Sequence, residues 1–361
     1  MAGCDKGISV YAGLGHSAAQ NAAYLEQAAS LGYRRLFTSL HIPEADPSGL
    51  ADEFARLIAI AVRFGFHVTA DISPRSFPMF DASLTNLEPF CRLGLHALRL
   101  DFGFTAAEIA RLTRKSPLTI ALNASALDEA ALDELATTRA DLSRIEAWHN
   151  YYPRPETGLS LPLYRQRSQL WQQRGIPVFT FIPSRENPRP PIGAGLPTLE
   201  QHRSLTPLVA AKHLAASGLT DAIVFGDPLA GTSELTAVAA CDTTCIELRV
   251  EARDDLHPHE QMLLWATRHT NRLDPGEAVI RSQEARDSCP GIIPARAPQP
   301  RPQGAVTIDN EQYRRYMGEL QIVQQDLPPD ERVNRVAMVV PEERFLLTLL
   351  QPGAPFRLKP A

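Results

Sequence analysis

The sequence predicts an α/β protein in which a (β/α)₈ TIM barrel is followed by a small β-rich domain. Three observations support this fold class. Apolar strand-like runs alternate with amphipathic helical stretches through the first two-thirds of the chain, glycine marks many helix-to-strand junctions, and the pattern changes after about residue 242. The 361 residues are enough for a barrel of about 250 residues and a module of about 100. We therefore expect domains over 1–241 and 242–361.

Eight repeats of one strand followed by one helix account for the first domain. Strands are expected at 8–11, 35–40, 67–72, 97–101, 118–123, 145–151, 177–182 and 222–227. Helices are expected at 17–31, 50–64, 106–112, 128–137, 163–173, 199–217 and after Ser233. Glycines that accept a left-handed backbone follow several of these helices: Gly32, Gly65, Gly94, Gly175 and Gly218.

Strands that alternate with helices form parallel sheets, and eight such units fit a closed barrel better than an open doubly wound sheet. The open sheet is the alternative, but no Gly-x-Gly-x-x-Gly fingerprint follows the first strand. After residue 242 the residues alternate between apolar and polar, as in half-buried antiparallel strands. Strands are expected at 246–250, 279–280, 305–308, 320–323 and 333–340, with a helix at 256–268 and an exposed proline-rich loop at 290–302.

Composition and charge exclude several classes of protein. The net charge of -5 and the short basic clusters argue against a nucleic-acid footprint. Five scattered cysteines argue against a disulfide framework, and Cys241 and Cys245 have no histidine at zinc-finger spacing. The sequence carries no signal peptide and no apolar run long enough to span a bilayer. We expect a cytoplasmic protein that needs no cofactor or metal.

In barrels of this type the active site lies at the C-terminal ends of the strands. The residues at those ends are polar and partly acidic, which is typical of a carbohydrate site. They are Tyr11, Thr38, Ser39, His41 with Glu44 beyond it, Asp71, Ser73, Arg99, Asp101, Asn123, Ser125, His149, Asn150, Tyr151, Ser184, Arg185 and Asp227. Two carboxyl groups can divide the work of a glycosidase between a proton donor and a nucleophile or base. Asp71 and Asp101 follow apolar runs on consecutive strands and are the predicted catalytic pair, with Glu44 as a third candidate.

Each of these residues also has a structural alternative. An aspartate at a strand end often caps a helix, His149 can be a buried structural histidine, and Asp227 before Pro228 can shape a turn. A metal site built from His41, Asp71 and His149 has no local motif to support it. A Schiff-base aldolase would need a lysine on a strand, and the expected barrel strands carry none. A sugar-phosphate isomerase and a non-catalytic sugar-phosphate binder remain as competing hypotheses.

The strand-end motifs resemble one known family in their order and spacing. They include Phe37-Thr38-Ser39-Leu40, Asp71-Ile72-Ser73-Pro74, Leu98-Arg99-Leu100-Asp101, the run from His149 to Leu159, Phe181-Ile182-Pro183-Ser184 and Gly195 to Arg203. In the second domain the matching stretches are 307–310, 318–323 and 330–334. The chain is similar over nearly its whole length to the MupG-type 6-phospho-N-acetylmuramidase family.

The resemblance implies a TIM barrel with a cyclophilin-like C-terminal domain. It implies hydrolysis of a disaccharide of N-acetylmuramic acid 6-phosphate and N-acetylglucosamine, a cytoplasmic step in peptidoglycan recycling. The phosphate and the lactyl carboxylate of such a substrate need cationic and amide donors. The expected substrate-binding residues are Tyr11, Ser39, Asn123, His149, Asn150, Tyr151, Arg154, Ser184, Arg185, Arg203 and, from the second domain, Arg281. Arg286 is a further candidate, although Ala285 stands where the family usually has serine.

Overall fold

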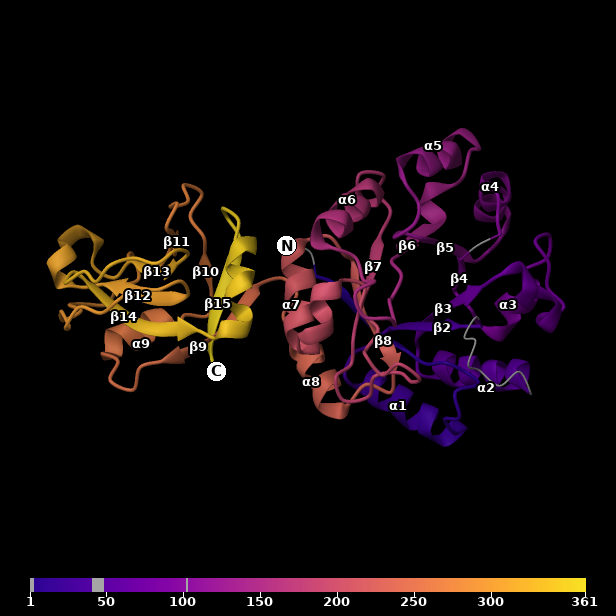
Figure 1. Cartoon of the computed structure of the whole chain (residues 1–361), viewed down its shortest axis with the longest axis horizontal. Coiled ribbons are helices and arrows are strands. Elements are labelled where there is room, and N and C mark those ends of the chain that lie inside the picture. Colours follow the sequence, from indigo (N-terminus) through magenta and orange to yellow (C-terminus); the bar gives the residue numbers. More distant parts are fainter. Residues whose placement is uncertain (1–2, 41–48, 102) are drawn as a thin grey trace. The chain divides into compact units, whose positions relative to one another are not determined.

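The computed structural model describes residues 3–40, 49–101 and 103–361. The chain divides into two compact units (Figure 1). One consists of Cys4–Leu214 and Gly218–Ala240, and the other consists chiefly of Cys241–Ala361. In the part of the chain that the structure describes, no helix is long and apolar enough to cross a membrane.

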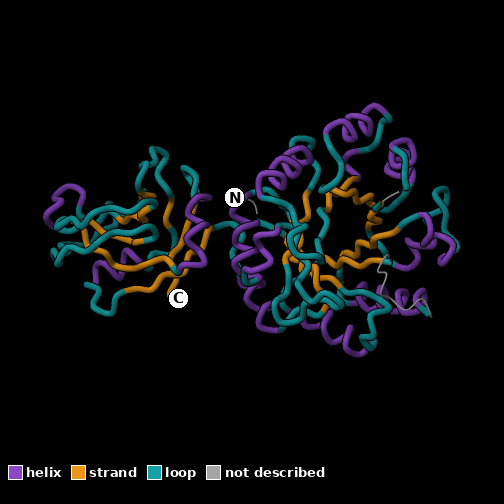
Figure 2. Tube along the Cα trace, in the orientation of Figure 1, coloured by secondary structure: helices purple, strands orange, loops and turns teal. Residues whose placement is uncertain are grey.

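The first unit is a closed barrel of eight parallel strands in sequential order, and the (β/α)₈ prediction is confirmed. Figure 2 shows the strands as a ring surrounded by helices. The strands are β1 (Asp5–Ser9), β2 (Arg35–Ser39), β3 (His67–Ile72), β4 (Ala97–Leu100), β5 (Thr119–Asn123), β6 (Ile145–Trp148), β7 (Val178–Ile182) and β8 (Ala222–Pro228). β1 starts earlier than expected and contains Lys6, which corrects the statement that no barrel strand carries a lysine. Lys6 lies near the N-terminal end of its strand and donates to the carbonyl of Ala239.

The helices follow the predicted amphipathic stretches. They are α1 (Ala18–Ser30), α2 (Leu50–Arg63), α3 (Glu88–Leu93), α4 (Ala106–Lys115), α5 (Glu129–Thr137), α6 (Leu161–Gln172), α7 (Pro207–Ser217) and α8 (Thr232–Ala240). Capping boxes at Ser17 and Thr105 satisfy the first backbone N–H groups of α1 and α4. The five junction glycines all have positive φ, as predicted. α3 was not predicted, because six residues are too few to show a helical period. Short 3₁₀ helices occupy Pro74–Phe80, Leu142–Arg144 and Glu200–Ser204.

The barrel interior is filled by large aromatic side chains that point inward from alternating strand positions. Trp148 stacks on Phe179 with 4.4 Å between ring centroids, and Phe37 packs edge-on against Phe181 at 5.0 Å. These side chains are all fully buried. They form the apolar floor beneath the C-terminal ends of the strands, so any polar residue in the next layer up faces the mouth of the barrel.

The second unit is built on a seven-stranded sheet in the order β10-β15-β9-β14-β12-β13-β11, and only the β9–β15 pair is parallel. The mostly antiparallel prediction is confirmed. The elements are β9 (Ile246–Ala252), α9 (Pro258–Leu264), β10 (His269–Thr270), β11 (Val279–Arg281), β12 (Ala305–Asp309), β13 (Leu320–Val323), β14 (Val333–Val339) and β15 (Pro355–Pro360), with 3₁₀ segments at Glu311–Tyr316 and Pro341–Leu349. The proline-rich stretch has no regular structure, but the prediction of a simply exposed loop is wrong at Ile293, which is fully buried in the core of this unit.

Candidate active site

A cavity of about 200 Å³ opens at the mouth of the barrel. It is lined from the ends of β2, β3, β4, β6 and β7, so strands far apart in sequence contribute to one site. Six of the predicted site residues meet there: Ser39, Asp71, Asp101, His149, Asn150 and Tyr151. Phe37, Arg99 and Phe181 complete the lining. His149, Asn150 and Tyr151 were expected within strand β6, but the strand ends at Trp148 and they lie just beyond it.

The centre of the cavity is an ion-pair cluster of two carboxylates on one arginine. Asp71 and Arg99 are paired in register on adjacent parallel strands. The Arg99 Nη1 donates to Asp71 Oδ1 at 2.9 Å and to Asp101 Oδ1 at 3.4 Å. Ser39 Oγ donates to the second Asp71 oxygen at 3.3 Å, and Arg99 Nη2 donates to Asn150 Oδ1. The register of β2, β3 and β4 thus assembles the cluster.

Arg99 is almost fully buried, with 4% of its side chain exposed. Burial acts to lower its pKa, but the carboxylates of Asp71 and Asp101 more than offset that effect, and the pKa of Arg99 is raised. The guanidinium is therefore a fixed positive charge. A fixed charge in a site of low dielectric favours the ionised form of the carboxyl group nearest to it, which is Asp71. Arg99 was noted at a strand end, but no pattern in the sequence indicates that it joins the two acids.

His149 has a supporting position in this cluster. Its ring nitrogens lie 3.1 Å from Ser125 Oγ and 3.0 Å from Ser168 Oγ, and Ser125 Oγ also accepts the backbone N–H of Asn150. Burial, with a smaller effect of the nearby Arg99 charge, lowers the pKa of His149 to about 3. The imidazole is neutral at physiological pH, and its polar contacts hold the loop that presents Asn150 and Tyr151.

A second charged feature at the mouth was not predicted. Arg189, on the loop after β7, lies with its Cζ 5.4 Å from the ring centroid of Tyr11 and 5.2 Å from that of Tyr151. It donates to the Tyr151 hydroxyl at 3.1 Å. The Tyr11 hydroxyl donates to the carbonyl of Gly226, and burial raises its pKa well above the usual range. Arg189 is in an irregular loop, where no periodicity relates a residue to a strand end.

Three other predicted residues organise loops in the structure. Both oxygens of the buried Asp227 accept backbone N–H groups, as its turn-shaping alternative requires. Ser184 Oγ donates to Glu234 at 2.6 Å. Asn123 Oδ1 accepts the N–H groups of Ser125 and Ala126 at 3.1 and 3.2 Å. These contacts fix the rim of the mouth.

The predicted arginines differ in what their side chains contact. Arg203 donates to both oxygens of Glu200 and to the carbonyls of Ala194, Gly195, Tyr152 and Arg154, so its guanidinium joins two rim loops. Arg185 donates to the carbonyl of Arg203, and Arg154 is exposed. Arg281 forms a bidentate pair with Glu319 in the second unit, at 2.6 and 3.1 Å. His41 and Glu44 lie outside the described residues.

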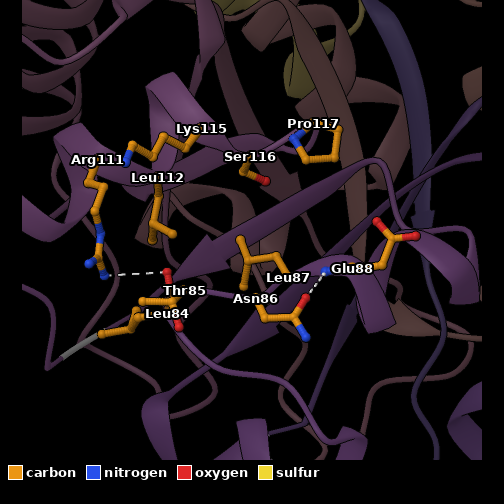
Figure 3. Close-up of a pocket in the computed structure, with 10 residues that line it drawn as sticks. All are labelled: Leu84, Thr85, Asn86, Leu87, Glu88, Arg111, Leu112, Lys115, Ser116 and Pro117. Carbon is orange, nitrogen blue, oxygen red and sulfur yellow. Dashed lines mark hydrogen bonds between the residues drawn. The ribbon is translucent and has the colours of Figure 1, made fainter.

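A larger pocket of about 290 Å³ lies on the outside of the barrel (Figure 3). Arg111 donates to the carbonyl of Leu84 there, and Lys115, Ser116 and Pro117 line one wall. Ser116 and Pro117 precede β5, so this pocket adjoins the N-terminal end of that strand, away from Asn123 at its other end. Because chemistry in such barrels occurs at the C-terminal ends, the smaller cavity is the candidate active site.

No group of three or more His, Cys, Asp or Glu side chains that could hold a metal ion is found among residues 3–40, 49–101 and 103–361. All five cysteines lie among the described residues, and none of them forms a disulfide bond. What the mouth offers is a pair of carboxyl groups on a buried arginine, an aromatic floor, amide and hydroxyl groups, and a second arginine. That set fits the class of barrel glycoside hydrolases, in which two acids act at the glycosidic bond.

Comparison with known proteins gives the particular family. The 6-phospho-N-acetylmuramidase N-terminal model matches residues 6–240, and the C-terminal model of the same family matches residues 246–359. The chain belongs to this family of glycosidases, whose name specifies a phosphorylated muramic acid sugar as the substrate.

Two solved structures of similar chains support the fold along its whole length. A crystal structure of an uncharacterized B. cereus protein is 31% identical, with a TM-score of 0.90, and the match covers 99% of this chain and 100% of that one. A conserved Enterococcus faecalis protein of unknown function is 36% identical, with a TM-score of 0.75 and coverage of 99% and 96%. No curated protein matches the chain.

Proposed function

We propose that the protein hydrolyses the glycosidic bond between N-acetylmuramic acid 6-phosphate and N-acetylglucosamine, in the cytoplasmic recycling of peptidoglycan. The observation that carries this proposal is the cluster of Asp71, Arg99 and Asp101 at the mouth of the barrel. It places two carboxyl groups in one small cavity, and these groups differ in their contact with Arg99 and in their exposure to solvent. The alternative of a sugar-phosphate isomerase has no observation in its favour.

The two carboxyl groups have different roles in this proposal. Asp71 has the shorter contact with Arg99 and a side chain that is 10% exposed, so it is the acid held ionised. Asp101 has the longer contact and a side chain that is 30% exposed, so we assign it the role of proton donor to the leaving group. Asp71 therefore attacks the anomeric carbon while Asp101 gives its proton to the leaving oxygen as the glycosidic bond breaks. Asp101 then takes a proton from water, which attacks the same carbon and releases Asp71.

The geometry favours retention of anomeric configuration. Both Oδ1 atoms contact the same nitrogen of Arg99, so their separation cannot exceed the sum of those two contacts. That limit lies below the roughly 6.5–9.5 Å separation of inverting pairs and accommodates the about 5–5.5 Å of retaining pairs. Glu44 stays a candidate acid, as the sequence predicts.

The rest of the mouth suits a sugar. Asn150 and Tyr151 offer amide and hydroxyl groups to the ring, while Phe37 and Phe181 provide an apolar surface for its C–H face. We propose that Ser39 also contacts the sugar, that the buried Tyr11 supports the ring of Tyr151, and that Arg154 and Arg185 contribute positive charge at the rim. Asn123, His149, Ser184 and Arg203 act in this proposal by positioning the loops that contact the substrate.

The test is incubation of the purified protein with the phosphorylated disaccharide and with its unphosphorylated counterpart, with the products identified by mass spectrometry. Cleavage restricted to the phosphorylated form is the expected result. Proton NMR of the first product anomer checks retention, and an inverted product would refute the assigned roles of Asp71 and Asp101. A rise in melting temperature on adding the disaccharide, without any product, would show a binding protein instead.

A further inference from the structure

The loop between β7 and α7 is held rigidly against the barrel by one buried aspartate. Asp227 Oδ2 accepts the N–H groups of Ser184 and Leu196 at 2.8 and 3.0 Å, and its Oδ1 accepts the N–H of Arg189 at 2.8 Å. Asp227 is completely buried. A single side chain thus anchors three points in the first part of this loop, one of which is the backbone N–H of Arg189.

The side chain of Arg189 is positioned as firmly as its backbone. Its guanidinium lies beside the rings of Tyr11 and Tyr151, within 5.4 and 5.2 Å of their centroids, and donates to the Tyr151 hydroxyl. Tyr11 and Tyr151 also contact each other edge-on, with their centroids 6.5 Å apart. Guanidinium groups stack on aromatic faces and bind carboxylate and phosphate oxygens through two parallel hydrogen bonds.

Tyr151 connects this arginine to the catalytic cavity, because it lines the same cavity as Asp71 and Asp101. Those two acids repel any anionic ligand, and the charge of Arg99 is already shared between them. A sugar that carries two anionic groups therefore needs a further fixed positive charge beside the cavity. Arg189 is a half-buried cation in that position.

We propose that Arg189, supported by Tyr11 and Tyr151, is the anion-binding residue of the active site and contacts an oxyanion of the substrate. This inference rests on the proposed function for the identity of the ligand. The oxyanion belongs to either of two groups of the muramic acid sugar, the 6-phosphate or the lactyl carboxylate. Both present oxygens that a guanidinium binds with two parallel hydrogen bonds.

The test measures binding by calorimetry and does not depend on turnover. The probes are N-acetylmuramic acid 6-phosphate, N-acetylglucosamine 6-phosphate, which lacks the lactyl group, and N-acetylmuramic acid, which lacks the phosphate. Arg189→Gln is expected to weaken binding of the first probe roughly 10- to 100-fold. If Arg189 binds the phosphate, wild type and variant should bind N-acetylmuramic acid with equal affinity. If Arg189 binds the lactyl carboxylate, they should instead bind N-acetylglucosamine 6-phosphate with equal affinity.

Two further variants keep the result interpretable. Arg189→Lys retains the charge without the planar fork, and we expect a loss smaller than that of Arg189→Gln. Arg165→Gln removes an exposed arginine on α6 and is expected to leave all three affinities unchanged. The proposal is overturned if Arg189→Gln weakens all three probes by the same factor, if it weakens none, or if the wild type binds no N-acetylmuramic acid 6-phosphate.

The results for Arg189 can be distinguished from the results that test the proposed hydrolase activity. Loss of affinity confined to one group, in a protein that cleaves no disaccharide, supports the anion site and refutes the hydrolase. Cleavage of the phosphorylated disaccharide with an unchanged KM in Arg189→Gln supports the hydrolase and refutes the anion site.

Discussion

Each unit of the molecule contains an arginine that is paired with acid, but the two arginines differ in their burial and in the number of acids that they contact. In the barrel, Arg99 is 4% exposed and contacts both Asp71 and Asp101, and the cluster lines a cavity. In the second unit, Arg281 is 21% exposed and gives both of its contacts to Glu319, which is 4% exposed. Arg99 is thus a buried charge shared by two acids, whereas Arg281 neutralises one.

The consequence is seen at the acid that Arg281 does not contact directly. Burial, and then the charges of Glu319 and Asp330, raise the pKa of Asp309 to about 8, and the charges of Arg301 and Arg281 oppose this only in part. Asp309 is therefore protonated in the folded protein at neutral pH. The comparison shows that an acid beside arginines is not by that fact ionised. Asp71 differs from Asp309 in that its carboxylate accepts directly from an arginine, Arg99, at 2.9 Å.

The largest expected effect comes from Asp71→Asn, compared with Asp309→Asn. In the barrel the substitution removes the ionised carboxylate that attacks the sugar, and we expect kcat to fall by at least about 10³-fold. In the second unit it replaces a protonated acid by a group of the same shape, and kcat should not change. Steady-state kinetics on the phosphorylated disaccharide, with circular dichroism to confirm folding, checks both. Full activity of Asp71→Asn would remove Asp71 from the mechanism.

The next effect is on stability. Arg99→Gln leaves the buried Asp71 without its ionic partner, which costs about 3–5 kcal/mol in comparable cases. Arg281→Gln similarly leaves Glu319, but Arg281 is more exposed, so solvent already screens that pair and the loss should be smaller. Urea unfolding of both variants measures the two losses. A greater loss for Arg281→Gln would contradict the comparison.

Much of the fold could be predicted because its elements carry strong local signals. β8, for example, is buried along its whole length, and the junction glycines have the positive φ that their position suggested. β10 was missed because it has two residues, and β15 because prolines stand at both of its ends and indicate turns. Ile293 was misplaced because the prolines around it hide a single buried residue.

The strand-end residues of the site could be predicted from the sequence, but the contacts of its arginines could not. Barrel topology brings strand ends together, so Ser39, Asp71 and Asp101 could be placed from sequence alone. Whether an arginine contacts ligand or protein depends on acceptors that are distant in sequence. Arg203 was expected to bind substrate, yet it contacts carbonyls of two rim loops, while Arg189 was not considered because it lies in an irregular loop.

The buried histidines of the barrel and Asp309 of the second unit should contribute to stability with opposite dependence on pH. Burial lowers the pKa of His67 and of His213 to about 4 and that of His149 to about 3. Below the unfolded value near 6.5 the unfolded histidines bind protons that the folded ones do not, so the barrel loses stability as pH falls from 6.5 toward 4. For Asp309 the folded pKa is above the unfolded one, so the second unit loses stability as pH rises from about 4 to 8.

Hydrogen exchange followed by mass spectrometry resolves peptides from each unit and measures this directly. After correction for intrinsic exchange rates, barrel peptides around β6 should be less protected at pH 5 than at pH 7, and β12 peptides should be less protected at pH 8 than at pH 6. The same sign in both units would mean that Asp309 titrates normally.

The smallest expected effect isolates Asp309 itself. The wild type gives up a proton from Asp309 on unfolding at neutral pH, and that release favours the unfolded state. Asp309→Asn removes the titration while keeping the shape, so at pH 7.5 the variant should be more stable than wild type by at least about 1 kcal/mol. The gain should vanish near pH 3, where the carboxyl group is largely protonated in both states. Urea unfolding at the two pH values gives both numbers. A variant that is less stable at pH 7.5 would show that Asp309 is ionised and paired in the folded protein. That is the state proposed for Asp71, and the two clusters would then not differ in the ionisation of their acids.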